Sequence, residues 1–106
     1  MLSIGKLSTA TGVKVPTIRY YEEIGMLRVA DRNEGNQRCY DQTDCDRLNF
    51  IRHSRELGFP LEAIRDLLSL SDRPNQSCAA ADAIAQSQLM AVNQRIDRLQ
   101  KLKSEL

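Results

Sequence analysis

The chain has 106 residues, of which 42% are hydrophobic and 27% are charged. This length allows one domain with one appended element, and the composition is that of a folded globular protein, which excludes extensive disorder. The formal net charge is only +1, so a surface for nucleic acid would have to arise from local placement of basic residues and not from bulk charge.

The compartment is suggested by the apolar runs and the cysteines. No apolar run approaches the length of a membrane span, and the N-terminus MLSIGKLSTA lacks the apolar segment of a secretory signal. We therefore expect a cytoplasmic protein with no membrane partner. The three cysteines, Cys39, Cys45 and Cys78, are odd in number and scattered, which argues against a disulfide framework and leaves thiolate chemistry open.

Two short helices are predicted within the first 25 residues. Ser3 is a candidate N-cap and Gly12 suits a helix C-terminus, with apolar residues at helical spacing between them: Ile4, Leu7 and Ala10. A second helix is predicted to start around Val15 or Pro16 and to stop at Gly25, with an apolar face made of Ile18, Tyr21 and Ile24. Two short helices joined by about three residues form a helix-turn-helix pattern.

A small β-hairpin is predicted after these helices. Residues 27–30 and 37–40 have the character of short strands, and the intervening Asn33-Glu34-Gly35-Asn36 supplies residues that tight turns favour. We interpret this hairpin as a wing beside the helix-turn-helix.

Two further helices follow the hairpin. Asp41 or Thr43 can cap a helix that ends at Gly58 and carries Leu48, Ile51 and Leu57. Pro60 opens another helix, whose predicted buried stripe is Leu61, Ile64, Leu67 and Leu68. The sequence thus predicts a DNA-binding-type winged domain over residues 1–70, a linker over 71–77 that contains Pro74, and a final helix over 78–106.

The final segment has the pattern of a long helix that needs a partner. No glycine or proline occurs from Cys78 onward, and an apolar seam recurs at intervals of three and four residues, formed by Leu89, Val92, Ile96, Leu99 and Leu106. Such a helix is roughly 40 Å long, and a domain this small offers nothing to cover its far end. We therefore predict a homodimer through this helix, in either a parallel or an antiparallel arrangement.

Two segments carry candidate contacts to nucleic acid. An arginine and tyrosine hydroxyls on an exposed helix, as in Thr17-Ile18-Arg19-Tyr20-Tyr21-Glu22, can bond phosphates or base edges. The alternative is that the tyrosines are core aromatics and Arg19 is only solvated. A hairpin tip bearing Arg32, Asn36 and Arg38 can reach the backbone beside the major groove, although an ordinary polar turn has the same composition.

The order of segments resembles one family of bacterial transcriptional regulators. SIGKLSTATGVKVPTIRYYEEIGML, then RNEGNQRCY, then RLNFIRHSRELGFPLEAIRDLL and a long helix are similar to the MerR family over essentially the whole chain. The resemblance implies a mainly α, winged helix-turn-helix fold with an antiparallel coiled coil. It implies DNA contacts by the helix residues Thr17, Arg19, Tyr20 and Tyr21, by the wing residues Arg38 and Tyr40, and more weakly by Arg32 and Asn36. Lys14 is included with them, although many members have a Ser or Thr helix cap there.

The resemblance also implies a mechanism. Family members bind as dimers to a palindrome in promoter DNA, and effector binding makes the dimer distort that DNA so that RNA polymerase can use the promoter. In the metal-sensing branch, a cysteine at the position of Cys78 reaches across the dimer to a metal. The resemblance therefore implies a divalent effector, namely zinc, cadmium, lead or mercury.

The expected metal site is incomplete in these 106 residues. A thiolate site needs three or four ligands, and in the family the others come from a loop that we expect beyond Leu106. The alternative for Cys78 is a small apolar side chain at a helix start. Cys39 and Cys45 match no metal motif, and His53 is expected to face solvent.

Some classes of protein other than a metal-sensing regulator share parts of this sequence pattern. The wing string Gly35-Asn36-Gln37-Arg38 is similar to that of the family's redox-sensing branch, so a redox or small-molecule sensor is the alternative effector class. An excisionase-like architectural protein would share the winged domain but would need no long helical seam. An enzyme is not expected, because the sequence has no phosphate-binding glycine loop, no His-Glu pair at metal spacing and no C-x-x-C.

Overall fold

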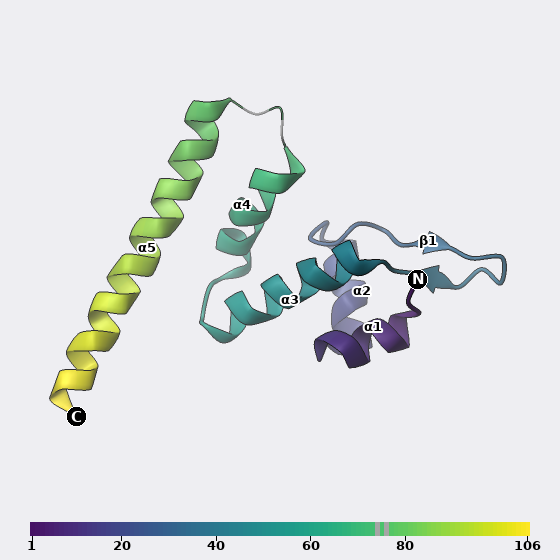
Figure 1. Ribbon diagram of the computed structural model, residues 1–106, viewed down its shortest axis with the longest axis horizontal. Coiled ribbons are helices and arrows are strands. Elements are labelled where there is room, and N and C mark those ends of the chain that lie inside the picture. The colour runs from purple at the N-terminus through teal and green to yellow at the C-terminus, as the bar shows by residue number, and fades with distance from the viewer. Residues whose placement is uncertain (74, 76) are drawn as a thin grey trace. The chain divides into compact units, whose positions relative to one another are not determined.

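The computed structural model describes residues 1–73, 75 and 77–106. In chain order the elements are α1 (Ile4–Thr11), α2 (Val15–Glu23), β1 (Asp31–Arg32), β2 (Arg38–Cys39), α3 (Gln42–Glu56), α4 (Leu61–Asp72) and α5 (Cys78–Glu105) (Figure 1). The prediction of a mainly α fold with a small hairpin and a long final helix is confirmed. The chain divides into two compact units, Met1–Leu61 and Glu62–Leu106.

The predicted helix starts and stops of the helix-turn-helix are confirmed by the caps. The Ser3 side chain accepts a hydrogen bond from the Lys6 N–H at 3.2 Å, and Gly12 ends α1 with a φ of 74°, in the left-handed region that glycine adopts most easily. Helix α2 begins after Lys14, which makes no side-chain capping bond, and a proline lies in its first turn. The expectation of a weakly capped α2 therefore holds.

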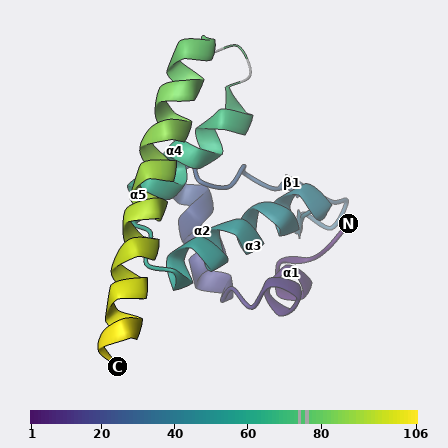
Figure 2. The same cartoon turned by 60° about the vertical axis from the view of Figure 1, so that its left-hand side comes forward.

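The core of the first unit is formed where α1 packs against α2 and α3. Figure 2 shows these three helices converging beside the hairpin. The side chains with essentially no exposed surface include Leu7 from α1, Ile18 from α2, and Leu48 and Ile51 from α3. Burial of each such side chain stabilises the fold by about 1.5–3 kcal/mol, so this small cluster fixes the direction of α2.

The prediction for the first hairpin strand is wrong. The strand is Asp31–Arg32 and not residues 27–30, and its register pairs Asp31 with Cys39 and Arg32 with Arg38. The turn sets this register, because the Asn33 N–H donates to the Gln37 carbonyl at 2.9 Å and the Asn33 side chain accepts from the Gln37 N–H at 2.9 Å. The predicted turn is thus confirmed, while the second strand is shorter than predicted.

The residues expected in the first strand serve the core instead. Leu27 is 2% exposed and Ala30 is 7% exposed, and neither pairs with the hairpin. The backbone of Tyr40, which the predicted strand would have needed, is taken by Leu2: their N–H and carbonyl groups exchange hydrogen bonds at 2.7 and 2.8 Å. Residues 27–30 therefore connect α2 to the wing and contribute the Leu27 and Ala30 side chains to the core.

The N-terminus of α3 is fixed by two aspartates. Asp41 is the N-cap, and a capping box joins it to Asp44: the Asp44 N–H donates to the Asp41 side chain at 3.0 Å and the Asp41 N–H donates to the Asp44 side chain at 2.9 Å. Of the apolar residues predicted for this helix, Leu48 and Ile51 are buried, but Leu57 lies just past its end and is 67% exposed. The stripe therefore stops one turn earlier than expected.

The second unit holds most of α4 and all of α5. Ile64 and Leu68 of the predicted α4 stripe are buried, whereas Leu61 and Leu67 are half-buried. Helix α4 extends to Asp72, so it overlaps the predicted linker over 71–77, in which residues 74 and 76 lie outside the described residues. In α5, which at 28 residues is about 42 Å long, none of the described side chains is buried. Within the described ranges, no helix combines the length and hydropathy that crossing a membrane requires.

Candidate nucleic-acid interface

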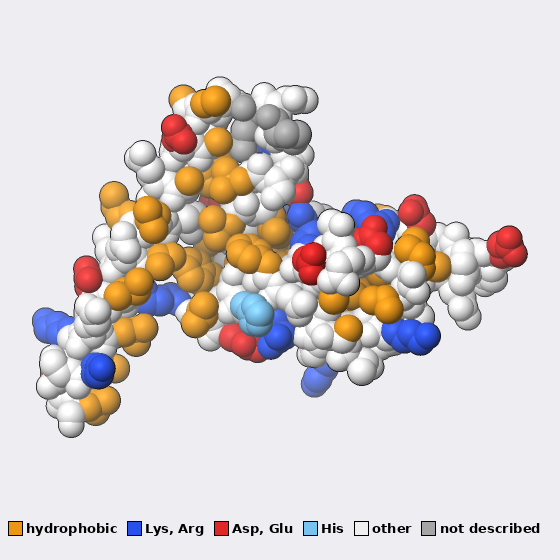
Figure 3. All heavy atoms as spheres, in the orientation of Figure 1, with side chains coloured by type: hydrophobic (Ala, Val, Ile, Leu, Met, Phe, Trp, Pro, Cys, Tyr) orange, Lys and Arg blue, Asp and Glu red, His pale blue; other side chains and the backbone are white. Residues whose placement is uncertain are grey.

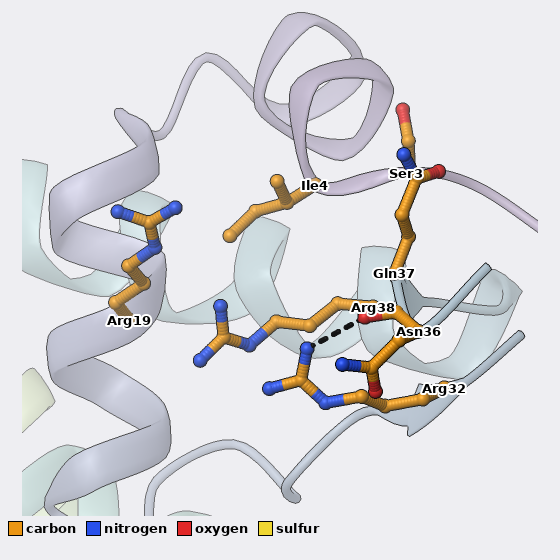
Figure 4. A pocket seen from close by; sticks show the side chains of 7 residues that line it. All are labelled: Ser3, Ile4, Arg19, Arg32, Asn36, Gln37 and Arg38. Atoms are coloured by element: carbon orange, nitrogen blue, oxygen red, sulfur yellow. Dashed lines mark hydrogen bonds between the residues drawn. The ribbon is translucent and has the colours of Figure 1, made fainter.

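An open groove lies between the start of α1, helix α2 and the hairpin (Figure 4). Its volume is about 340 Å³, and Arg19 projects into it from α2 while Arg32 and Arg38 extend from the hairpin. The remaining lining residues are Ser3, Ile4, Asn36 and Gln37. Three guanidinium groups line the same groove, and guanidinium groups bind phosphate oxygens well, so the groove is suited to phosphates.

Three aspartates close to the hairpin are paired with one arginine outside the groove. Arg28 forms ion pairs with Asp44 at 2.7 Å, Asp41 at 3.6 Å and Asp31 at 3.7 Å. By contrast, among the residues that the structure describes, neither Arg19 nor Lys14 has an ion-pair partner. Because these aspartates are paired with Arg28 and not with the arginines of the groove, a chain with a net charge of only +1 can present a locally basic groove.

The tip of the hairpin holds two of the predicted contact residues in a fixed arrangement. Arg32 donates from Nη1 to the Asn36 carbonyl at 2.9 Å, across the turn. Asn36 has a φ of 60°, a left-handed conformation that asparagine tolerates better than most residues. Both side chains are exposed, so they remain candidate contacts.

Helix α2 presents only some of its predicted contacts to solvent. Arg19 is exposed, Tyr20 is 47% exposed and Thr17 is half-buried, but Tyr21 is only 8% exposed. The two tyrosine rings have centroids 6.1 Å apart, and they point to different environments. Tyr20 is therefore the more accessible of the two tyrosines. Tyr21 lies on the side of Ile18, and its remaining exposed surface lines an open pocket with Lys14 and Thr17, so the expected contact by Tyr21 stays a prediction.

Tyr40 is also not on the surface. Its side chain is fully buried, and its hydroxyl donates a hydrogen bond to Oε1 of Glu22. Burial, followed by this hydrogen bond, raises the pKa of Tyr40, which keeps the hydroxyl protonated as a donor. The expected contact of Tyr40 with the DNA backbone does not fit this arrangement, in which Tyr40 joins the end of the wing to α2.

Glu22 is the residue that sequence reasoning missed. Its side chain is only 8% exposed, and its second oxygen, Oε2, lies 3.7 Å from Nε of Arg38. The signal was its position four residues after Ile18, which places a carboxylate on the buried face of α2. A carboxylate on such a face needs a partner, because burial of an unpaired charge is costly.

The three cysteines lie in three different elements. Cys78 is exposed as the first residue of α5, Cys39 is half-buried in β2, and Cys45 is buried in α3. In the described part of the chain, no group of three or more His, Cys, Asp or Glu residues is placed to hold a metal ion. Cys78 therefore supplies one thiol and not a closed site.

Two family models together match nearly the whole chain. Residues 2–71 match the family described as MerR HTH family regulatory protein, and residues 45–106 match the family described as MerR, DNA binding. The chain belongs to the MerR family. It is therefore a DNA-binding transcriptional regulator and not an enzyme, as the sequence predicted, and the excisionase-like alternative is set aside.

Individual relatives span the whole chain. The HTH-type transcriptional regulator ZntR of Escherichia coli K12 is 43% identical over 107 residues, which cover 100% of this chain and 76% of that protein. The crystal structure of PbrR691 from Ralstonia metallidurans CH34 in complex with lead(II) is 37% identical with a TM-score of 0.68, over 99% of this chain and 82% of that one. The crystal structure of a putative MerR family transcriptional regulator from Listeria monocytogenes has 31% sequence identity and a TM-score of 0.85. The match covers 99% of this chain and 80% of that chain.

Proposed function

We propose that this MerR family member binds double-stranded promoter DNA through the groove between α2 and the hairpin. The observation that carries the proposal is the convergence of Arg19, Arg32 and Arg38 in that groove, with the exposed Tyr20 on the same helix as Arg19. Guanidinium groups bind phosphates bidentately, so the groove would fix the position of the DNA backbone while the exposed face of α2 approaches the bases. Lys14 and Thr17 lie at the start of the same helix and would add contacts there.

Arginine substitutions test this interface. A duplex would first be selected from a random-sequence pool by the native chain, and its binding measured by fluorescence anisotropy. Arg19→Ala and Arg38→Ala should each weaken binding at least tenfold and should reduce the slope of log affinity against log salt by about one. Arg98→Ala, which removes an exposed arginine of α5 outside the apolar seam, is the matched control. Equal affinities for all three variants would contradict the proposed interface.

We further propose that two copies of the chain pair through α5. Figure 3 shows hydrophobic side chains along this helix, and large apolar side chains are exposed at Leu89 (59%), Ile96 (45%), Leu99 (58%) and Leu106 (98%), with Val92 half-buried. Their spacing of three and four residues is that of a coiled-coil seam, in which a partner helix would cover them. A dimer would present two winged domains to the two halves of a palindrome, which is the arrangement expected for promoter binding beside RNA polymerase.

The seam can be tested by sedimentation. Leu99→Glu should convert the dimer to a monomer at micromolar concentration, because a carboxylate at the centre of the seam would be buried against apolar side chains. Lys101→Glu, on the opposite side of the same helix, should leave the dimer intact. A native chain that sediments as a monomer would contradict the proposal.

The proposed effector is a divalent metal ion that favours thiolate ligands. The support is the similarity to ZntR and to PbrR691, which was crystallised with lead(II), together with an exposed thiol at the first position of α5. Because Cys78 is a single ligand, the remaining ligands would have to come from the partner subunit or from the segment expected beyond Leu106.

A cadmium titration tests the effector. Ultraviolet absorption from thiolate-to-metal charge transfer should appear and saturate, and it should weaken in Cys78→Ser but not in Cys39→Ser, whose thiol lies in the wing. The protein made from its complete reading frame is the appropriate sample. Absence of the band in the native protein would refute the metal proposal and would favour a redox or small-molecule effector, without affecting the proposed DNA interface.

A further inference from the structure

A single carboxylate joins α2 to the wing. Glu22 lies on α2, and its two oxygens face two residues of the hairpin end: Oε1 accepts the hydroxyl hydrogen of Tyr40, and Oε2 lies 3.7 Å from Nε of Arg38. The Glu22 and Tyr40 side chains are 8% and 0% exposed, and Arg38 is about one third exposed. The two hairpin residues are 16 and 18 positions away in the chain, so the contact is tertiary.

Burial makes this arrangement persistent. A carboxylate removed from water needs hydrogen bonds and an opposite charge, and Tyr40 and Arg38 supply one of each. Tyr40 is itself held from a second side, because its backbone exchanges two hydrogen bonds with Leu2. The base of the wing is therefore held by Leu2, which precedes α1, and by Glu22 of α2.

The same contact orients the Arg38 side chain. Its Nε edge faces Glu22, while its terminal amino groups have no hydrogen-bond partner among the residues that the structure describes. Figure 4 shows the Arg38 guanidinium extended across the groove toward α2, which carries Arg19. The two donors that Arg38 would offer to a phosphate are thus left free and directed.

We propose that Glu22 is a positioning residue for DNA binding, which holds the phosphate-binding arginine of the wing at a fixed reach from Arg19 on α2. The inference rests on the proposed DNA interface. Its physical basis is preorganisation: a side chain that is already ordered in its bound direction loses less conformational freedom when DNA binds. Glu22 itself makes no contact with DNA in this proposal.

Electrostatics alone predicts the opposite effect for a substitution at Glu22. A carboxylate near the phosphates repels them, so its neutralisation should tighten DNA binding unless it positions another group. Glu23 provides the matched control, because it is the next residue, is exposed, and lines the neighbouring groove with Arg19 and Arg38. No interaction of Glu23 with another described residue is found.

The test compares Glu22→Gln with Glu23→Gln on the selected duplex. Glutamine retains an oxygen that accepts the Tyr40 hydroxyl hydrogen, so the substitution removes mainly the attraction to Arg38. We expect Glu22→Gln to bind DNA about tenfold more weakly than the native chain, and Glu23→Gln to bind equally well or more tightly. In the background of Arg38→Ala, Glu22→Gln should cause no further weakening, which a general loss of stability would not reproduce.

A stability measurement and a second variant separate a loss of positioning from a loss of folding. Thermal unfolding checks that each variant is folded at the assay temperature, and if Glu22→Gln is not, Arg38→Lys replaces it, since lysine retains the charge but lacks the Nε edge that faces Glu22. Arg38→Lys should then weaken binding about tenfold. If Arg38→Ala weakens binding while Glu22→Gln tightens it as Glu23→Gln does, the positioning role is wrong and the interface stands. If Arg38→Ala has no effect while Arg19→Ala weakens binding, Arg38 is not part of the interface and the positioning role is wrong. If neither variant weakens binding, the proposed interface fails as well.

Discussion

A partly buried ion pair joins Arg28, in the segment between α2 and the wing, to Asp44 of α3, and we predict that its removal destabilises the first unit. Asp44 is 2% exposed and accepts hydrogen bonds from Nη2 of Arg28 at 2.7 Å and from the Asp41 N–H at 2.9 Å. In Arg28→Met the apolar stem is retained and the guanidinium is lost. The Asp44 carboxylate then remains buried with the Asp41 N–H as its donor.

The expected cost follows from the exposure of the two partners. Removal of one member of a fully buried pair costs about 3–5 kcal/mol, because the other charge is left unpaired. The Arg28 side chain is 39% exposed, so water already screens part of the attraction and can replace part of it. We therefore expect a loss of about 1–2 kcal/mol in the free energy of unfolding, or a fall in Tm of about 5–15 °C for a domain of this size.

Urea unfolding followed by far-ultraviolet circular dichroism measures this loss. All variants should be compared at one protomer concentration, since dimerisation would make the apparent stability depend on concentration. Glu56→Gln is the control, because it removes an exposed (i, i+4) ion pair with Arg52 and should cost no more than about 0.5 kcal/mol. A cost for Arg28→Met no larger than that of the control would refute the argument that Asp44 depends on Arg28.

Three further predictions concern the first unit. Gly12→Ala should destabilise it by about 1 kcal/mol in urea unfolding, because alanine disfavours a φ of 74° even though the nearest side-chain atoms of Arg52 are 3.9 Å from the added carbon. Leu48→Ala should cost about 2–5 kcal/mol by the same assay, since the side chain is fully buried. The hydrogen bond from the Asp44 N–H, with Arg28 nearby, lowers the pKa of Asp41 from 3.8. The Asp41 carboxylate therefore stabilises the fold above that pH, and this stabilisation is lost as the pH falls through the lower pKa of the folded state. In unfolding experiments at decreasing pH, Asp41→Asn should lack this loss of stability.

Features set by a few neighbouring residues were predictable from the sequence. The caps at Ser3 and Asp41, the left-handed stop at Gly12 and the turn at Asn33-Glu34-Gly35-Asn36 all occur as expected. Each depends on hydrogen bonds or backbone preferences within about four residues, which the local sequence specifies. The family resemblance rests on the order and spacing of such local segments, and it was confirmed.

Features that depend on distant partners were not predictable. The first strand was misplaced because the backbone of Tyr40 pairs with Leu2, nearly forty positions away, and because Leu27 and Ala30 are needed in the core. Helical spacing placed Tyr21 on the apolar face with Ile18, but it did not show how deeply either tyrosine is buried, since that depends on the elements that cover α2.

The amino-acid sequence by itself therefore determined the class of protein, the helix-turn-helix and the two arginine-bearing segments that flank the groove. Only the tertiary structure decided that Tyr20 is exposed while Tyr21 and Tyr40 are buried, and that Glu22 lies between α2 and the wing. The physical reason is that a side chain's environment is the sum of contacts from several elements. Periodicity identifies the face that a residue occupies, but only packing determines what covers that face.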